Sequence, residues 1–222
     1  RAVSVVDDYT MVSYERLVTL WQQVRYLDRA KVSGCLVECG AWKGGACGMM
    51  ALAHLAGETP VRPLYLFDSF EGLPEPDGAH DGEVAVQYAG GSASAALRSI
   101  GRCTSSVEEP QRLLKELIGY PQALTHYHVG WFQDTVPVAA PTMGPIALLR
   151  LDGDWYHSTK LCLEQLYPKV SAGGIVVIDD YGRWPGCRKA VDEFLQQLTR
   201  PVLLHHIDAA ARYWMVPDEL PR

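Results

Sequence analysis

The fold is decided by the stretch LLRLDGDWYHSTKLCLEQLYPKVSAGGIVVIDDYG at residues 148–182. It contains most of one apolar run at 146–151 and all of a second at 175–178, separated by a helical pattern that ends at Pro168. An apolar strand, a helix and another apolar strand predict a parallel β-α-β unit that is buried on both faces. Both runs end in aspartate: Asp152 follows the first, and Asp179 and Asp180 follow the second.

The same alternation continues toward both ends of the chain. We expect further strands at 35–39, 64–67 and 124–129, and a closing antiparallel pair at 202–205 and 212–216. Helical patterns occupy 13–28, 44–56, 107–118, 158–167 and 185–198. These elements predict an α/β fold: a seven-stranded, mainly parallel sheet with helices on both faces. We expect one domain over 1–222, with a helical N-terminal segment at 1–30.

Residues 71–95 show no clear periodicity and are rich in Gly, Pro, Ser and acids. A loop of this length in a compact domain is usually a lid, a binding loop or a disordered segment, and we predict a lid. Between Arg62 and Arg98 the chain has no Lys or Arg but contains six acids: Asp68, Glu71, Glu75, Asp77, Asp81 and Glu83.

Composition excludes several function classes. The chain has 222 residues, 48% of them apolar, and 20 Lys and Arg against 26 Asp and Glu, a net charge of −6. This balance disfavours a general nucleic-acid binder. No apolar run approaches the roughly 20 residues that cross a bilayer. The six cysteines form no CxxC pair and suit a reducing compartment, so we expect a soluble cytoplasmic protein without a membrane partner.

The acids at the strand ends are the strongest chemical signal. Ligands of parallel sheets gather at the carboxyl ends of strands, and the ends of neighbouring strands lie about 5 Å apart. Asp152, Asp179 and Asp180 would therefore converge on one hard divalent cation such as Mg²⁺. Alternatively, Asp154 and Asp180 are helix caps and the others are solvated. The nearby His157 is a candidate general base or an ordinary surface histidine.

A glycine-rich turn, GAWKGG at 40–45, follows the first strand. It is either a ligand-binding turn or a plain strand-to-helix connection. Its GxxxGG spacing differs from GxGxxG, and no GxxxxGK[ST] occurs, so NAD and P-loop nucleotides are disfavoured. Asp68 could accept both hydrogen bonds of a ribose diol, or serve as a cap or a solvated acid. Glu38 needs a partner if buried, and a ligand amine or a cluster of backbone amides would supply one.

Six blocks resemble the macrocin O-methyltransferase (TylF-type) family: TMVSYERL (10–17), VECGAWKGG (37–45), LYLFDSFEGLPEP (64–76), VGWFQDTVP (129–137), LLRLDGDWYHSTKLCLEQLYPKVSAGGIVVIDDYG (148–182) and PGCRKAVDEF (185–194). The resemblance implies a class I methyltransferase fold that uses S-adenosylmethionine and a divalent metal, usually Mg²⁺. It also implies a homodimer and a small glycosylated substrate, a macrolide or an aminocoumarin, whose sugar hydroxyl is methylated.

Site residues carried over from the resemblance fall into two groups. The implied cofactor residues are Thr10, Met11, Glu38, Gly40, Ala41, Asp68, Ser69, Ser106, Val107, Gly130 and Asp152. Asp152, Asp179 and Asp180 are the implied metal ligands, and Asp152 is also the implied base. His157 departs from the pattern, because an acid is expected at its position, and this leaves the preference for substrate charge open.

Three alternatives remain: a methyltransferase for catechol-like phenols, a cofactor-binding module of the same fold without activity, and an NAD-linked enzyme, which the glycine spacing does not support. Several aromatic residues could stack on a sugar or polyketide ring or belong to the core: Trp42, Trp131, Trp155, Trp184 and Tyr181. The 71–95 loop is expected to close over the acceptor and exclude water.

Overall fold

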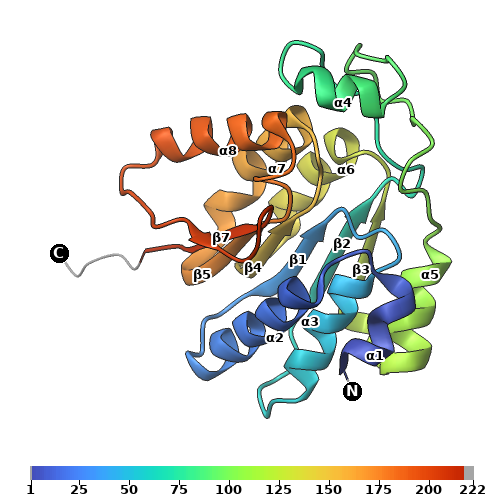
Figure 1. The fold of residues 1–222 in the computed structure, drawn as a ribbon. Helices are drawn as coiled ribbons and strands as arrows, with labels where there is room; N and C mark the ends of the chain where they lie inside the picture. Colours follow the sequence, from blue (N-terminus) through green and yellow to red (C-terminus); the bar gives the residue numbers. More distant parts are fainter. Residues whose placement is uncertain (1, 218–222) are drawn as a thin grey trace.

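A computed structural model describes residues 2–217; residue 1 and residues 218–222, the ends of the predicted domain, lie outside the described residues. Its centre is one seven-stranded sheet in the order β3-β2-β1-β4-β5-β7-β6 (Figure 1). The strands are β1 (Cys35–Cys39), β2 (Leu64–Asp68), β3 (Thr125–Val129), β4 (Ile146–Leu151), β5 (Val170–Ile178), β6 (His205–His206) and β7 (Arg212–Met215). Among the described strands, β7 alone runs opposite to the other six, which confirms the predicted fold class and the closing antiparallel pair.

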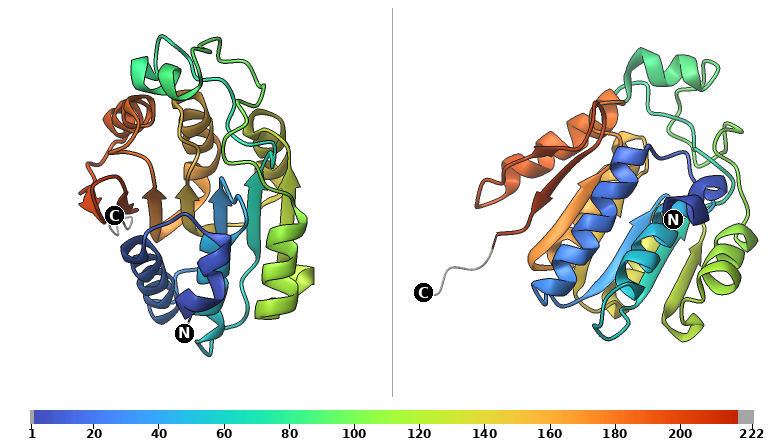
Figure 2. Two further views of the ribbon diagram at one scale, coloured as in Figure 1. Left: turned by 45° about the vertical axis from the view of Figure 1, so that its right-hand side comes forward. Right: turned by 60° about the horizontal axis from the view of Figure 1, so that its bottom comes forward.

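Helices cover both faces of this sheet (Figure 2). One face carries α1 (Ala2–Val6), α2 (Tyr14–Arg29), α3 (Gly45–Leu55) and α5 (Glu108–Gln111), which continues as a π-helical stretch at Arg112–Ile118. The other carries α6 (Phe132–Ala139), α7 (Tyr156–Leu166) and α8 (Pro185–Gln197). Short 3-10 turns lie at Asp7–Tyr9, Gln122–Leu124, Ala140–Thr142 and Tyr167–Lys169. Among residues 2–217, no helix is long and apolar enough to cross a bilayer.

The start of α2 and the core of the sheet follow directly from the sequence. Ser13 caps α2 by accepting a hydrogen bond from the backbone N–H of Arg16. Every residue of β1 and of β4 is buried, as expected for strands that are covered by helices on both faces.

The elements differ from the predicted ones in four places. Helix α6 was not predicted, because it has only eight residues and contains Pro137. Strand β5 begins at Val170 rather than at 175, because an irregularity in its pairing with β4 adds Val170 opposite Ile146. The run at 202–205 is a strand only from His205, where it pairs with β7. Within the predicted 71–95 loop, Gly82–Tyr88 forms a helix, α4.

The lid segment, defined here as residues 71–105, lies over the carboxyl ends of the strands (Figure 1). Isolated β-bridges, Pro74 with Ser99 and Asp77 with Ser94, fold it back on itself. The indole N–H of Trp155 donates to the carbonyl oxygen of Pro74 at 2.9 Å and ties the segment to the start of α7. The lid segment is therefore an ordered layer over the end of the sheet where ligands bind in such folds.

Candidate active site

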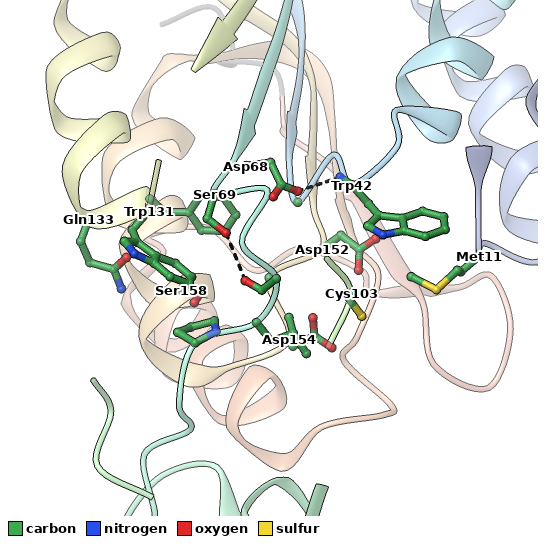
Figure 3. A pocket seen from close by; sticks show the side chains of 16 residues that line it. Met11, Trp42, Asp68, Ser69, Cys103, Trp131, Gln133, Asp152, Asp154 and Ser158 are labelled. Carbon is green, nitrogen blue, oxygen red and sulfur yellow. Dashed lines mark hydrogen bonds between the residues drawn. The ribbon is translucent and has the colours of Figure 1, made fainter. Parts of the chain in front are cut away.

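A pocket lies between the carboxyl ends of β1, β2 and β4 and the lid segment (Figure 3). Figure 3 shows Met11 and Trp42 on one side, Trp131 and Gln133 on the other, and Asp68, Asp152 and Asp154 between them. Five residues of the predicted site line it: Met11, Gly40, Asp68, Ser69 and Asp152. The lid segment contributes Gly72, Leu73, Pro74 and Cys103 to the wall.

Gly40 allows the ends of β1 and β4 to meet beneath this pocket. Its φ of +95° lies in the left-handed region, and an added Cβ would stand 1.9 Å from the carbonyl oxygen of Asp152. The backbone N–H of Asp152 donates to the Cys39 carbonyl at 2.8 Å, so the two chains stay bonded at this point. Glycine is needed here for a close approach of two backbones, which goes beyond what a plain connecting turn requires.

Asp68 holds the glycine-rich turn in place and faces the pocket. Its carboxylate accepts hydrogen bonds from the backbone N–H of Trp42 at 2.7 Å and of Phe70 at 2.6 Å. Burial raises the pKa of Asp68, and these backbone donors act against the rise. Each carboxylate oxygen can accept more than one hydrogen bond, so these contacts leave the predicted ribose interaction chemically open.

The predicted acid cluster forms, and a buried arginine lies within it. One ligand oxygen from each of Asp152, Asp179 and Asp180 lies within 4.8 Å of the others. Arg150, only 2% exposed, donates to Asp152 at 3.0 Å and to Asp179 at 2.5 Å. Arg16 donates to the second oxygen of Asp179 at 2.5 Å, which joins α2 to the cluster.

Glu38 is buried and therefore needs a partner. The guanidinium of Arg150 pairs with its carboxylate, and a contact with a ligand amine stays a prediction. The thiol of Cys47 donates to the other oxygen at 2.6 Å. Burial raises the pKa of Glu38 to about 7 despite the neighbouring Arg150. Glu38 and Arg150 are register partners on β1 and β4, which explains why they meet.

The cluster as a whole holds more carboxyl groups than guanidiniums. Among the described residues, it gathers five acids (Glu38, Asp152, Asp154, Asp179 and Asp180) around two guanidiniums, and Arg16 also pairs with Asp208. Burial and repulsion from Asp152 raise the pKa of Asp154 to about 8, and burial raises that of Asp180 well above its usual range. An oxygen-only donor set of crowded carboxyl groups fits a hard divalent cation.

The remaining cofactor candidates surround the turn but do not line the pocket. Gly130 donates its backbone N–H to the Asp68 carbonyl at 2.9 Å, beside the end of β2. Thr10 accepts from Val12 and packs against Gly45, at the start of α3. Ala41 is buried within the glycine-rich turn, and Ser106 and Val107 precede α5. Their roles in cofactor binding stay predictions.

His157 lies in the first turn of α7, where its side chain is 48% exposed. Its Nε2 lies 2.8 Å from a carboxylate oxygen of Asp77 in the lid segment, and it does not line the pocket. Its position suits the surface alternative, and a role as general base stays a prediction. Of the aromatic candidates, Trp42 and Trp131 line the pocket, whereas Trp155 and Trp184 are buried and pack together.

Arg150 and the lid contacts are the functional features that sequence reasoning missed. A charged residue inside the otherwise apolar run 146–151 was a visible signal, since a buried guanidinium needs acidic partners. The pairing of Glu38 with Arg150 could be predicted only once β1 and β4 were known to be neighbours.

Comparison with known proteins identifies the family. The family described as macrocin O-methyltransferase (TylF) matches residues 6–216. Demethyldecarbamoylnovobiocin O-methyltransferase of Streptomyces niveus is 37% identical over 206 residues, which cover 93% of this chain and 75% of the relative. The 8-demethyl-8-(2,3-dimethoxy-alpha-L-rhamnosyl)-tetracenomycin-C 4'-O-methyltransferase of Streptomyces olivaceus is 34% identical, with coverages of 93% and 75%.

The solved structures give the same result. The O-methyltransferase NovP superposes with a TM-score of 0.80 at 34% identity, covering 95% of this chain and 83% of NovP. The superposition with NovP and the family match over residues 6–216 therefore support the same conclusion. The chain belongs to the macrocin O-methyltransferase family and is an O-methyltransferase.

Proposed function

We propose that this enzyme transfers the methyl group of S-adenosylmethionine to a sugar hydroxyl of a glycosylated natural product, with the help of a divalent cation such as Mg²⁺. The observation that carries the proposal is the pocket in which Gly40, Asp68 and Asp152 face one another beneath the lid segment. The printed names of the relatives support the substrate class, since one of them acts on a rhamnosyl-bearing tetracenomycin.

The cofactor side of the pocket is assigned to the glycine-rich turn and to the end of β2. Gly40 lets the backbone approach the ligand, and Asp68 offers oxygens to a ribose diol while it fixes the turn. Met11, Trp42 and Ser69 complete this side. The surrounding acids favour a cofactor that carries a positive sulfonium charge.

The acceptor side is assigned to Asp152, whose side chain is one quarter exposed and reaches the pocket. Its carboxylate would take the proton of the sugar hydroxyl as that oxygen bonds to the methyl group and the methyl–sulfur bond of the cofactor breaks, which leaves a neutral thioether. Arg150 fixes the orientation of the carboxylate by donating to one of its oxygens. Asp152, Asp179 and Asp180 would hold the cation, which when bound lowers the cost of negative charge on the acceptor oxygen.

The lid segment excludes water and positions the acceptor. Leu73 and Pro74 form an apolar part of the pocket wall, held by the hydrogen bond from Trp155. Holding the two reactants in line can supply roughly 7–11 kcal/mol of the barrier. The proposal also includes the predicted homodimer and a cytoplasmic location. Light scattering of the purified protein measures whether it is a dimer.

The test begins with calorimetric titration of S-adenosylmethionine, followed by turnover on macrolides, aminocoumarin glycosides and simple catechols, with and without Mg²⁺. We expect cofactor binding and metal-dependent methylation of a glycoside but not of a catechol. Asp152→Asn should retain cofactor binding and lose turnover, whereas Asp7→Asn, an exposed control, should retain both. Turnover near the wild-type rate in Asp152→Asn would remove Asp152 from the role of base. Equal activity on catechols would overturn the assignment of the acceptor.

A further inference from the structure

A second group of metal-ligating side chains lies outside the pocket, where the lid segment meets α7. Asp77 and His80 come from the lid segment, and His157 comes from the first turn of α7. One oxygen of Asp77 lies 2.7 Å from Nδ1 of His80 and 2.8 Å from Nε2 of His157. All three ligand atoms lie within 4.8 Å of one another. We propose that Asp77, His80 and His157 bind a borderline divalent cation such as Zn²⁺.

The donor set distinguishes this site from the acid cluster. Two imidazole nitrogens and one carboxylate oxygen are typical ligands of Zn²⁺, whereas Mg²⁺ prefers oxygen ligands alone. Zn²⁺ would lie about 2.0–2.2 Å from each atom, so the atoms need to separate only slightly from their present contacts. His157 is 48% exposed, which leaves room for a water molecule as a fourth ligand.

Contacts within the lid segment and with α7 already hold the side chains of this site in place. The backbone N–H of Ala79 donates to the other oxygen of Asp77 at 2.8 Å. The backbone N–H of Asp77 donates to the buried Asp81 at 2.7 Å. The ring of His80 stacks on Tyr156, with centroids 4.2 Å apart. A cation that binds here therefore orders few additional side chains, which favours affinity.

The location gives the site a consequence for the lid. Asp77 and His80 belong to the segment that carries Leu73 and Pro74 over the pocket, and His157 belongs to the helix that follows Asp152 and Asp154. A bound cation would fasten these two parts together. It would slow opening of the lid segment, and this consequence does not depend on which acceptor the enzyme methylates.

The test is calorimetric titration of Zn²⁺ into protein that is kept in excess Mg²⁺. The Mg²⁺ is added to fill oxygen-only sites, so that the titration measures Zn²⁺ binding elsewhere. We expect about one equivalent of Zn²⁺ to bind, with affinity reduced at least about tenfold in His157→Gln and in His80→Gln. His206→Gln, at an exposed histidine of β6, is the matched control and should bind as the wild type does. Hydrogen exchange adds a second readout: Zn²⁺ should slow exchange over 77–88 in the wild type but not in His157→Gln.

Two results would overturn the site. The first is Zn²⁺ binding of equal strength in the wild type, His157→Gln and His80→Gln. The second is Zn²⁺ binding that disappears only in Asp179→Asn, because the cation would then lie in the acid cluster. His157 is exposed, so its replacement should leave the fold intact, and the melting temperature without metal checks this.

Discussion

Replacing Arg150 by methionine tests whether this buried guanidinium holds the acid cluster together. Removing one partner of a buried ion pair costs about 3–5 kcal/mol, because the other charge stays buried without compensation. Three acids lose a partner here, but not equally. Asp179 keeps Arg16, and Asp152 is one quarter exposed and can be hydrated. Glu38, 1% exposed, has neither option. Because only one of the three acids is left without compensation, we expect a loss near the lower end of this range, about 3 kcal/mol.

The loss should depend on pH in a defined direction. Burial already raises the pKa of Glu38 to about 7, and loss of Arg150 raises it further. A carboxylate with a raised pKa in the folded state binds a proton that the unfolded state does not hold, so its contribution to stability falls as pH rises toward that pKa. Between about pH 7 and about pH 8.5, the Arg150→Met variant should lose more stability than the wild type does, by at most about 1.5 kcal/mol.

Urea denaturation at both pH values measures these differences. Arg150→Met combined with Glu38→Gln supplies the control, because it removes the stranded acid together with its partner and should recover part of the loss. A loss below about 1 kcal/mol at both pH values would refute the reasoning. So would a double variant no more stable than Arg150→Met, because Glu38 would then not be the residue that depends on Arg150.

Three further changes test other parts of the structure. Asp81→Asn places an amide where a buried carboxylate accepts hydrogen bonds from the backbone N–H groups of Asp77 and Tyr156. We expect a local loss of stability of about 1–3 kcal/mol, measured as faster proteolysis of the lid segment, and an unchanged rate of cleavage would contradict this. Gly40→Ala should lose at least about 2 kcal/mol in urea denaturation, and more than Gly119→Ala, where φ is also positive but an added Cβ meets nothing within 4 Å. Hydrogen bonds from Arg16 and two backbone N–H groups lower the pKa of Asp208 to about 2, so its stabilisation is present above about pH 4 and is lost as pH falls through about 2. Asp208→Asn should cost about 1 kcal/mol near pH 6 and clearly less near pH 2, and a difference independent of pH would exclude this origin.

Much of the fold could be predicted because local and global signals agree. The apolar runs at 146–151 and 175–178 are strands because only a sheet covered on both faces buries them completely. The acids that follow them meet because the carboxyl ends of parallel neighbours lie at one edge. These inferences need only the alternation of strands and helices.

The contacts of the lid segment could not be predicted in this way. Its acids stand in a stretch without Lys or Arg, which suggests a solvated, repelling loop. In the structure they find partners at a distance along the chain: Glu75 pairs with Arg98, and Asp81 accepts from the start of α7. Such pairings depend on how a loop docks, and no short-range period in the sequence records this.

Arg150 shows how the chemistry of the site and the stability of the fold are linked. Convergence of Asp152 and Asp179 predicts that something positive lies between them, and the resemblance to metal-dependent enzymes points to an ion. The chain also supplies a cation of its own, through a residue whose register partner on β1 is Glu38. Arg150 offsets part of the repulsion and fixes the carboxylates before any ligand arrives. The acids that remain leave oxygen donors for the divalent cation proposed above, so under that proposal the arginine orients the ligands and does not replace the cation.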